Sequence, residues 1–383
     1  MKIFENINKA VIAGIMTGNS LDGIDVAIVR FSRDNEKFHY NLLAFDTFEY
    51  EDSFKIKLKA IIEKKASIDI ISEVNIELSH LYADALIKLC SNESISLDTI
   101  YAVGIHGQTV WHDPHSCIPN TLQLGSISAL SKIINKIVVG DFRIADLVLG
   151  GEGAPLVPIF DYNFLKSHEE NRIILNIGGI ANVTNIPQGS SIEEVIAFDT
   201  GPGNTLIDCF TKEYFDMDYD KNGDIASFGE IIQPLFDKLK EDTFIKKVPP
   251  KSTGKEKYNK EYIMNLINEL NLNKLKPDNI IRTLTEFTVW SIAENIRLFC
   301  SNSAKIIASG GGIHNNFLWK RLRNVLNQYE LIKSNAYGLN PDAKEAICFA
   351  FLAFSTLNKI PTNLPNVTGA KKKTVLGVIS IPD

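Results

Sequence analysis

Apolar and polar positions along the chain predict the same order of elements twice. In the first half, apolar runs predict three strands, two helices, a buried strand, a helix and a closing strand. The second of the two helices carries an apolar stripe at helical spacing that includes Ile71, Val74 and Leu78. The predicted strands of this half cover residues 9–16, 23–31, 38–48, 100–105 and 137–140.

The second half repeats this order of elements. Its clearest helix begins at Pro277, because proline is favoured at the first helical position. A helix over residues 342–357 and a strand over residues 374–379 end the chain. The other predicted strands of this half cover residues 172–177, 181–186, 195–198, 305–308 and 330–333.

The repeated order predicts an α/β fold made of two similar domains. Each domain would hold a mixed sheet, in which an antiparallel meander continues into parallel strands reached by right-handed crossovers. Loops at the strand ends of both sheets would flank a deep cleft, where open α/β sheets bind their ligands. We expect one lobe to comprise residues 1–140 plus 359–383 and the other to comprise residues 141–358.

Composition narrows the class of protein. The 383 residues are 45% apolar and 22% charged, as in ordinary globular proteins, and the net charge of −6 shows no basic excess for nucleic-acid binding. Five dispersed cysteines without a CxxC pair favour reduced thiols. The longest apolar stretch, residues 347–354, is far shorter than the roughly 20 residues of a membrane span. We therefore expect a cytoplasmic protein that binds neither nucleic acid nor membrane.

Two glycine-tipped hairpins are candidates for phosphate binding. Residues 14–25 join two predicted strands through a loop of small polar residues, whose N–H groups and hydroxyls can approach a phosphate closely. Residues 176–182 form a second such hairpin at the matching place of the second half. Each hairpin alone is also compatible with a plain turn. Two at equivalent positions would hold the phosphates of a nucleotide from both sides.

Three further strand ends carry candidate chemistry. Asp199 ends a strand before a rigid turn, which suits a general base or, alternatively, an Asp that caps the turn. Asp141 and Arg143 follow the strand at 137–140, and Arg143 is suited to grip a carboxylate or phosphate, with a structural Asp141–Arg143 pair as the alternative. Gly310 to Gly312 open a predicted helix after a buried strand and would form a flat floor for a base or ribose.

The spacing of other residues predicts no metal site. His106, His112 and His115 lack metal-ligand spacing, and the residues from Trp111 to Pro114 predict an irregular loop. The segment from Asp218 resembles the start of a calcium loop, but its twelfth position is Gly229 instead of a glutamate. The chain also has no GxSxG, GxGxxG or GxxxxGK[ST] motif.

Taken together, the motifs resemble those of the anhydro-N-acetylmuramic acid kinase family, sugar kinases of the actin and heat-shock-70 ATPase superfamily. Asn19 and Trp111 depart from this resemblance, because the family usually has Thr and Arg there. The blocks that carry the resemblance run nearly from end to end of the chain and include residues 14–25, 106–109, 139–143, 175–182, 198–208, 249–254, 310–315 and 342–346.

The resemblance implies two ribonuclease-H-like lobes and a specific reaction. ATP and water would convert 1,6-anhydro-N-acetylmuramic acid to N-acetylmuramic acid 6-phosphate and ADP, in the recycling of cell-wall peptidoglycan. Asp199 matches the family's base, Mg²⁺ would accompany ATP, and a homodimer is suggested. The implied ATP-binding residues are Thr17, Gly18, Asn19, Ser20, Leu21, Asp22, Gly23, Ile24, Gly178, Gly179, Gly311 and Gly312. The implied sugar-binding residues are Gln108, Asp141, Arg143 and Glu345.

Two alternatives stay open at this stage. One is a kinase for another sugar or for a carboxylate in the same superfamily. The other is an ATP-switched binding module without enzyme activity. A phosphorylation assay with N-acetylmuramic acid and its anhydro form separates the kinases from each other. ATP hydrolysis that no sugar changes would favour the binding module.

Overall fold

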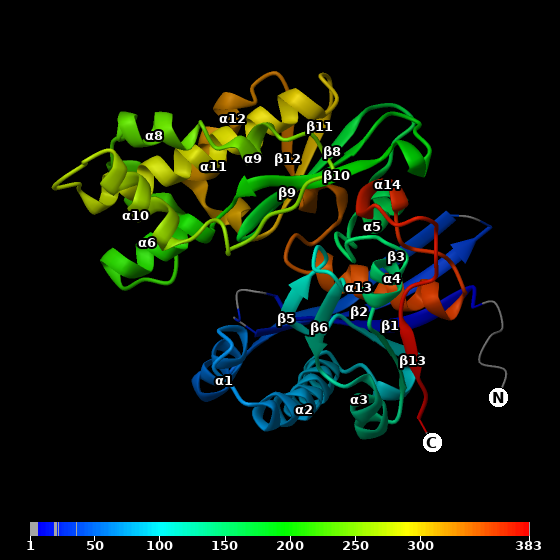
Figure 1. Ribbon diagram of the computed structural model, residues 1–383. Coiled ribbons are helices and arrows are strands. Elements are labelled where there is room, and N and C mark those ends of the chain that lie inside the picture. Colours follow the sequence, from blue (N-terminus) through cyan, green and yellow to red (C-terminus); the bar gives the residue numbers. More distant parts are fainter. Residues whose placement is uncertain (1–6, 19–20, 22, 36, 383) are drawn as a thin grey trace. The chain divides into compact units, whose positions relative to one another are not determined.

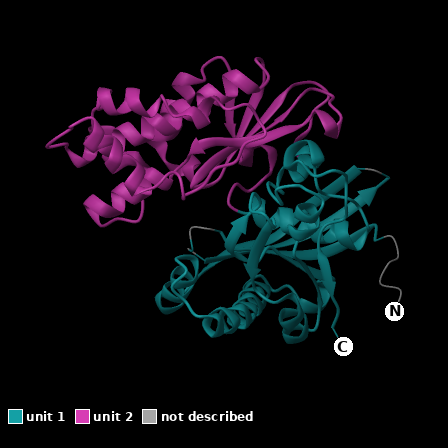
Figure 2. Cartoon of the chain, viewed as in Figure 1, with its two compact units in different colours: residues 1–164, 343–383 teal, residues 165–342 magenta. Residues whose placement is uncertain are grey.

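The computed structural model describes residues 7–18, 21, 23–35 and 37–382. The chain forms two compact units, which are unit 1 (residues 1–164 and 343–383) and unit 2 (residues 165–342) (Figure 2). The expected division gave residues 141–164 and 343–358 to the second lobe. Both segments belong to unit 1 in the structure, because the helices that they contain pack on the elements of that unit.

Unit 1 is built on a mixed sheet. Its strands are β1 (Lys9–Met16), β2 (Gly23–Asp34), β3 (Lys37–Glu49), β4 (Ala102–Ile105), β7 (Ile137–Gly140) and β13 (Val378–Ser380). Within the described residues they lie in the order β13-β7-β4-β1-β2-β3. β1 to β3 form an antiparallel meander, and β4 and β7 continue from β1 as parallel strands. β13 pairs antiparallel with β7.

Helix α13 (Lys344–Leu357) lies directly on one face of this sheet, where two glycines allow the backbones to meet (Figure 1). A β-carbon on Gly14 in β1 would lie 1.9 Å from the Ala346 carbonyl oxygen. One on Gly104 in β4 would lie 2.3 Å from the Phe349 carbonyl oxygen. All residues of α13 except Glu345 are buried. The helix therefore fixes the positions of two central strands at once.

The opposite face of the sheet packs on other helices of unit 1. Ala13 and Ile15 flank Gly14 and point to this face, because successive side chains of a strand alternate. They share a buried apolar core with Leu58 and Leu78. The helices of unit 1 besides α13 are α1 (Asp52–Ile62), α2 (Ile68–Asn92), α3 (Ile127–Ile134), α4 (Ile144–Val148), α5 (Pro158–Leu165) and α14 (Pro365–Thr368).

Unit 1 also contains a hairpin that the sequence did not predict in full. Strand β5 (Gln108–Asp113) pairs antiparallel with β6 (Asn120–Leu124), with a bulge between Thr109 and Trp111. The irregular loop expected from Trp111 to Pro114 is therefore wrong for residues 111–113, because they pair with β6. A polar strand on a two-stranded hairpin lacks the apolar run that marks a strand of the main sheets.

Unit 2 repeats the sheet order of unit 1. Its strands are β8 (Arg172–Ile177), β9 (Ile180–Ile186), β10 (Ile196–Pro202), β11 (Lys305–Ser309) and β12 (Glu330–Lys333). Within the described residues they lie in the order β10-β9-β8-β11-β12, with an antiparallel meander followed by two parallel strands. Its helices are α6 (Thr205–Phe215), α7 (Asp224–Phe228), α8 (Gln233–Leu239), α9 (Thr243–Lys246), α10 (Lys260–Glu269), α11 (Pro277–Phe299) and α12 (Asn316–Val325).

The expected α/β class with duplicated mixed sheets is confirmed. The order β3-β2-β1-β4-β7 in unit 1 corresponds to β10-β9-β8-β11-β12 in unit 2.

One local expectation needs correction, because the glycines at 310–312 do not open an α-helix. They enter a short 3₁₀ turn, η4 (Gly311–His314), before α12 begins. Among the described residues, no helix is both long and apolar enough to cross a membrane.

Replacing Gly14 by alanine tests the contact between α13 and the sheet. The added methyl group would overlap the backbone of α13, which cannot move aside as a flexible side chain can. We expect a loss of about 3 kcal/mol or more in the free energy of unfolding, at the upper end of overpacking penalties. Chemical denaturation followed by circular dichroism measures it. Gly311→Ala is the matched control, since no atom lies within 4 Å of its added carbon. Equal stability of the two variants would contradict the packing argument.

Candidate functional site

The loop after β1 carries the first group of predicted ATP-binding residues. Thr17 is buried, and its hydroxyl shares a hydrogen bond of 3.2 Å with the Tyr82 hydroxyl. Leu21 has a positive φ of 61°, and its N–H donates to the Gly18 carbonyl at 3.4 Å. Gly23 and Ile24 begin β2. The predicted residues Asn19, Ser20 and Asp22 lie outside the described residues.

Gln108 connects this loop to the start of β5. Its side-chain amide donates to the Gly18 carbonyl at 3.3 Å and to the Thr109 carbonyl at 3.4 Å. The side chain is fully buried, and its carbonyl oxygen has no hydrogen-bond partner within the described part of the chain. A buried acceptor without a partner costs free energy, so it favours a donor from a ligand at this place.

Arg143, at the start of α4, is held in one orientation by a histidine. Its Nε and Nη2 lie 3.1 and 2.9 Å from Nε2 of His106. Because that nitrogen accepts, His106 is neutral with its proton on Nδ1. Burial, and then the charge of Arg143, hold the pKa of His106 well below its usual value. Burial also lowers the pKa of Arg143 to about 10, so the guanidinium stays charged at neutral pH.

The other two predicted sugar-binding residues of unit 1 have different surroundings. Glu345 is the half-buried residue of α13, and burial raises the pKa of its carboxyl while Lys344 and Arg143 lower it. Asp141 has a positive φ of 56°, and its carboxylate accepts from the Ile144 N–H at 3.4 Å. This contact ties the Asp141 carboxylate to the backbone at the start of α4.

A pocket of about 310 Å³, lined by both polar and apolar groups, opens beside Asp141. Its walls come from α2, the end of β4, strand β6, the starts of α3 and α4, and β13, and they include His106, Gln123 and Asp141. Of the four predicted sugar-binding residues, only Asp141 lines it.

At the outer part of the hairpin β5–β6, the Lys64 ammonium lies 4.1 Å from the centre of the Trp111 ring. A positive charge is thus present at a position where the family usually has arginine.

In unit 2, Asp199 lies at a bulge inside β10. The pairing of β10 with β9 shifts between Asp199 and Gly201, which turns the strand at the candidate base. The Asp199 N–H donates to the Lys251 carbonyl at 3.1 Å, and its Oδ2 accepts from the Thr253 N–H at 2.9 Å. One loop, residues 249–254, therefore holds both the backbone and the carboxylate of Asp199.

Side chains of α11 hold the turn after Asp199 in place through hydrogen bonds. The Thr288 hydroxyl donates to the Gly203 carbonyl at 2.7 Å, and the Asn295 amide donates to the Thr200 carbonyl at 3.0 Å. Both side chains are fully buried. These contacts satisfy the carbonyl of Thr200, the extra residue at the bulge, and that of Gly203, just beyond the end of β10, so the turn keeps a fixed shape.

The tip of hairpin β8–β9 is joined to the same turn by backbone hydrogen bonds. The Gly178 carbonyl accepts from the Asn204 N–H at 2.8 Å, and the Gly179 carbonyl accepts from Gly203 and Thr205 at 2.8 and 3.0 Å. Because the Gly178 carbonyl and the Gly179 N–H belong to one planar trans peptide, that N–H points away from the turn. The predicted hairpin thus keeps a donor available on its other side.

The glycine loop after β11 lies across the end of β8. A β-carbon on Gly312 would lie 2.3 Å from the Ile177 side chain, whereas one on Gly311 would meet no atom within 4 Å. Gly311 is therefore the residue of this loop that borders open space, and Gly312 packs against the sheet. The two predicted residues have different environments.

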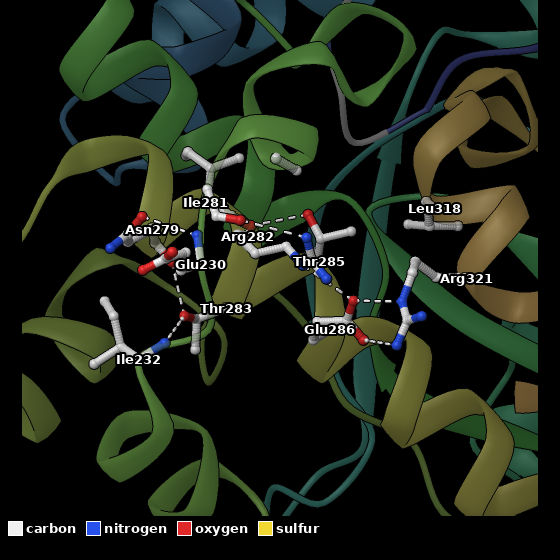
Figure 3. A network of polar contacts seen from close by, with 12 residues as sticks. Glu230, Ile232, Asn279, Ile281, Arg282, Thr283, Thr285, Glu286, Leu318 and Arg321 are labelled. Carbon is white, nitrogen blue, oxygen red and sulfur yellow. Dashed lines mark hydrogen bonds and ion pairs between the residues drawn. The ribbon is translucent and has the colours of Figure 1, made fainter.

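The helix that follows this loop is anchored by a buried ion pair network (Figure 3). Glu286 of α11 accepts from Arg282 at 3.1 Å and from Arg321 of α12 at 2.6 Å. The Glu286 side chain is only 5% exposed, so its charge needs both partners. The network holds α12 on α11 and with it the position of the glycine loop.

Sequence reasoning identified Asp199 and Arg143 but not the residues that hold them. His106 appeared in a search for metal spacing and inside a family block, and Lys251 and Thr253 only inside a family block. Lys255 was also missed, although a β-carbon on Gly179 would lie 3.6 Å from its Cε. A clue was present for the two lysines, since both closely follow the proline pair at 249–250.

Among the described residues, no group of three His, Cys, Asp or Glu side chains could hold a metal ion.

Comparison with known proteins identifies relatives along nearly the whole chain. A family model described as anhydro-N-acetylmuramic acid kinase matches residues 10–382. An anhydro-N-acetylmuramic acid kinase of Bacillus cereus is 37% identical over 380 residues, 97% of this chain and 99% of that protein. The enzyme of the same name from Caldanaerobacter subterraneus subsp. tengcongensis is 36% identical over 388 residues, 98% of each chain.

Solved structures show a weaker likeness. Component A of the (R)-2-hydroxyglutaryl-CoA dehydratase from Acidaminococcus fermentans has a TM-score of 0.47 and 10% identity, with 91% of this chain and 100% of that chain covered. The relatives and the family model, by contrast, confirm the family expected from the motifs. The chain belongs to the anhydro-N-acetylmuramic acid kinase family.

Proposed function

We propose that this chain converts 1,6-anhydro-N-acetylmuramic acid, ATP and water to N-acetylmuramic acid 6-phosphate and ADP. The observation that carries the proposal is the family match over residues 10–382, because it extends through both units. The held carboxylate of Asp199 and the oriented guanidinium of Arg143 support it. A cytoplasmic location and a homodimer, which composition and resemblance favour, belong to the same proposal.

The substrate dictates what the base has to do. O6 of the anhydro sugar is bonded to C1 and carries no proton, so it cannot attack ATP until that bond breaks. Asp199 takes a proton from water, the water oxygen bonds to C1, and the C1–O6 bond breaks. O6 then bonds to the γ-phosphorus, and ADP leaves. A single carboxylate thus serves a hydrolysis and a phosphoryl transfer, unlike the carboxylate pair of glycoside hydrolases.

Glycine-rich backbone is proposed to hold ATP. The loop at residues 17–24 contributes N–H groups to the phosphates, and the hairpin tip at Gly178 and Gly179 contributes the Gly179 N–H. Gly311 and Gly312 contribute the surface under the adenosine. Lys255, beside the hairpin tip, adds a positive charge. Phosphoryl transfer needs mainly placement and charge neutralisation, which these groups supply.

Mg²⁺ is proposed to enter bound to ATP, where it would neutralise phosphate charge. Asp22, which we propose to orient the ion through water, lies outside the described residues. In this proposal the phosphates and water supply most of the ligands of the ion.

On the sugar side, Arg143 is proposed to bind the lactyl carboxylate. His106 already occupies its Nε and Nη2, so the guanidinium keeps one orientation and presents its remaining N–H groups. Gln108 contributes its unpartnered carbonyl oxygen to a hydroxyl or amide donor of the sugar. Glu345 and Asp141 complete the set.

The reaction is tested by isotope transfer. Anhydro sugar, ATP and enzyme are incubated in ¹⁸O-labelled water, and the products are analysed by mass spectrometry. We expect one ¹⁸O at the anomeric hydroxyl of the sugar phosphate and none in the phosphate, because water attacks C1 and O6 attacks phosphorus. Label in the phosphate, or phosphorylation of N-acetylmuramic acid but not its anhydro form, would contradict the proposal.

Replacing Asp199 by asparagine tests the base. Turnover should fall by about 10²–10⁴-fold, the usual contribution of a general base, while ATP affinity stays nearly unchanged. Product assays and calorimetric titration with ATP measure the two quantities. Asp218→Asn removes an exposed carboxylate of the same unit and should retain full turnover. Normal product formation by Asp199→Asn would remove this residue from the mechanism.

Replacing Arg143 by lysine tests the carboxylate contact. Lysine keeps the charge but cannot form a fork, and loss of charged hydrogen bonds worth roughly 1.5–3 kcal/mol should raise the sugar KM about 10- to 100-fold. The KM for ATP should change little. Steady-state kinetics with each substrate varied gives both values. Arg30→Lys, at an exposed position of β2, is the control. An unchanged sugar KM would exclude Arg143 from this contact.

A further inference from the structure

Lys251 is a buried lysine in unit 2 that the mechanism above does not use. It is 4% exposed, although lysines are almost never fully buried without a partner. Its ammonium donates to the carbonyls of Phe244 and Ile245 at 3.1 and 2.7 Å. The rings of Phe244 and Phe299 lie 5.0 Å from the nitrogen, and the Phe198 ring lies 5.6 Å from it. Aromatic faces and carbonyl oxygens together form a site for a cation.

The backbone of the same residue holds the candidate base. The Lys251 carbonyl accepts from the Asp199 N–H at 3.1 Å, and two residues later the Thr253 N–H donates to Asp199 Oδ2 at 2.9 Å. The side chain of Lys251 ties this loop to α9, and the backbone of the loop ties down Asp199. A loss of the first contact therefore loosens the second.

The charge of Lys251 also acts on Asp199. Burial lowers the pKa of Lys251 to about 8, and the charge of Asp199 counteracts this fall. Asp242 acts in the same direction as Asp199, whereas Lys247 and Lys257 lower the pKa further. At neutral pH the side chain is therefore mostly an ammonium. Because Coulomb attraction is mutual, it favours the ionised carboxylate that a general base needs.

We propose that Lys251 is a positioning residue for Asp199, whose buried ammonium fixes the loop at 249–254 on the carboxylate and keeps that carboxylate ionised. The inference rests on the proposed function, in which Asp199 activates water. Two contributions are combined in one side chain, the anchoring of a loop and an electrostatic bias. They can be separated by substitutions that keep one and remove the other.

Three substitutions of Lys251 make the test. Lys251→Met keeps the apolar stem and removes both donors and charge, Lys251→Gln keeps donors without charge, and Lys251→Arg keeps the charge. We expect Met to lower kcat about 10- to 100-fold, as for a displaced reactive group, and Gln, which keeps donors, to lower it less, with KM values of both within about threefold of wild type. The acid limb of the kcat/KM profile should move up by about one pH unit in both. Lys251→Arg should leave that limb in place.

The control is Lys246→Met, which removes an exposed lysine from the adjacent α9. It should retain wild-type kcat and pH profile. Lys251→Gln keeps the inference testable if Lys251→Met fails to fold. A merely structural role would lower stability and the amount of active enzyme in all three variants, without moving the acid limb.

The outcomes distinguish this inference from the function on which it rests. Wild-type enzyme that makes no phosphorylated product from the anhydro sugar would overturn both. Wild-type turnover that is lost in Asp199→Asn, together with a Lys251→Gln variant of unchanged kcat and unchanged acid limb, would overturn the role of Lys251 alone. A shift of the acid limb in Lys251→Arg as large as in Lys251→Gln would also overturn it.

Discussion

The hydrogen bonds between the tip of hairpin β8–β9 and the turn before α6 are the constraint on which the candidate catalytic unit depends. Two glycine carbonyls accept three N–H groups from residues 203–205. The approach is so close that a β-carbon on Gly203 would lie 2.2 Å from the Gly178 oxygen. These bonds use the N–H groups of the turn within the protein, and they leave the hairpin N–H of Gly179 directed elsewhere. These hydrogen bonds therefore orient two candidate parts of the site, the hairpin tip at Gly178 and Gly179 and the turn that follows the candidate base Asp199.

The same turn shows how a sheet can present a reactive side chain. A regular β10 would satisfy its backbone in the ladder with β9, but the bulge after Asp199 removes part of that ladder. The buried Asn295 side chain of α11 bonds the Thr200 carbonyl at the bulge, and the buried Thr288 side chain bonds the Gly203 carbonyl just after β10. The bulge in β10 and the turn after it thus explain why α11 carries the polar residues Thr288 and Asn295 on a side that faces the core. Local departures from ideal structure, with compensation elsewhere, are typical of functional sites.

The sequence predicted the sheets well and the contacts at the site poorly, for physical reasons. Strands β1, β7, β8 and β12 have the predicted bounds. For β1, β7 and β8 the reason is that mostly buried strands are marked by apolar runs, whereas β12 is partly exposed. The hairpin at β5 was missed because its residues are polar and its partner strand is short. The bulge at Asp199 was missed because a single extra residue leaves no periodic signal. Assignment of α13 to the second lobe failed to foresee that Gly14 and Gly104 receive it on the first sheet.

For the candidate site, residue types were predictable but their partners were not. Arg143 follows a strand and Asp199 lies near the end of one, where sequence alone marks both as candidates. His106 and Lys251 bond to them across 37 and 52 positions of chain, distances over which neither periodicity nor spacing carries information. Family resemblance named the blocks that contain these residues without giving their contacts. Only the fold shows that the loop at 249–254 and the bulge in β10 form one structure.

The buried charge of Lys251 indicates that the loop at 249–254 serves the chemistry of Asp199 and does not add to the stability of the fold. The pKa of Lys251 is about 8 in the folded chain and near 10.5 in an unfolded one, so burial disfavours the ammonium. Between these values the unfolded chain binds more protons, and stability gained from this group rises with pH. The cost is therefore fully present below pH 8 and disappears toward pH 10.5. A neutral side chain of similar volume would avoid it at physiological pH. What the ammonium supplies in return is a fixed loop and a favourable charge beside Asp199, both of which matter only if that carboxylate takes a proton.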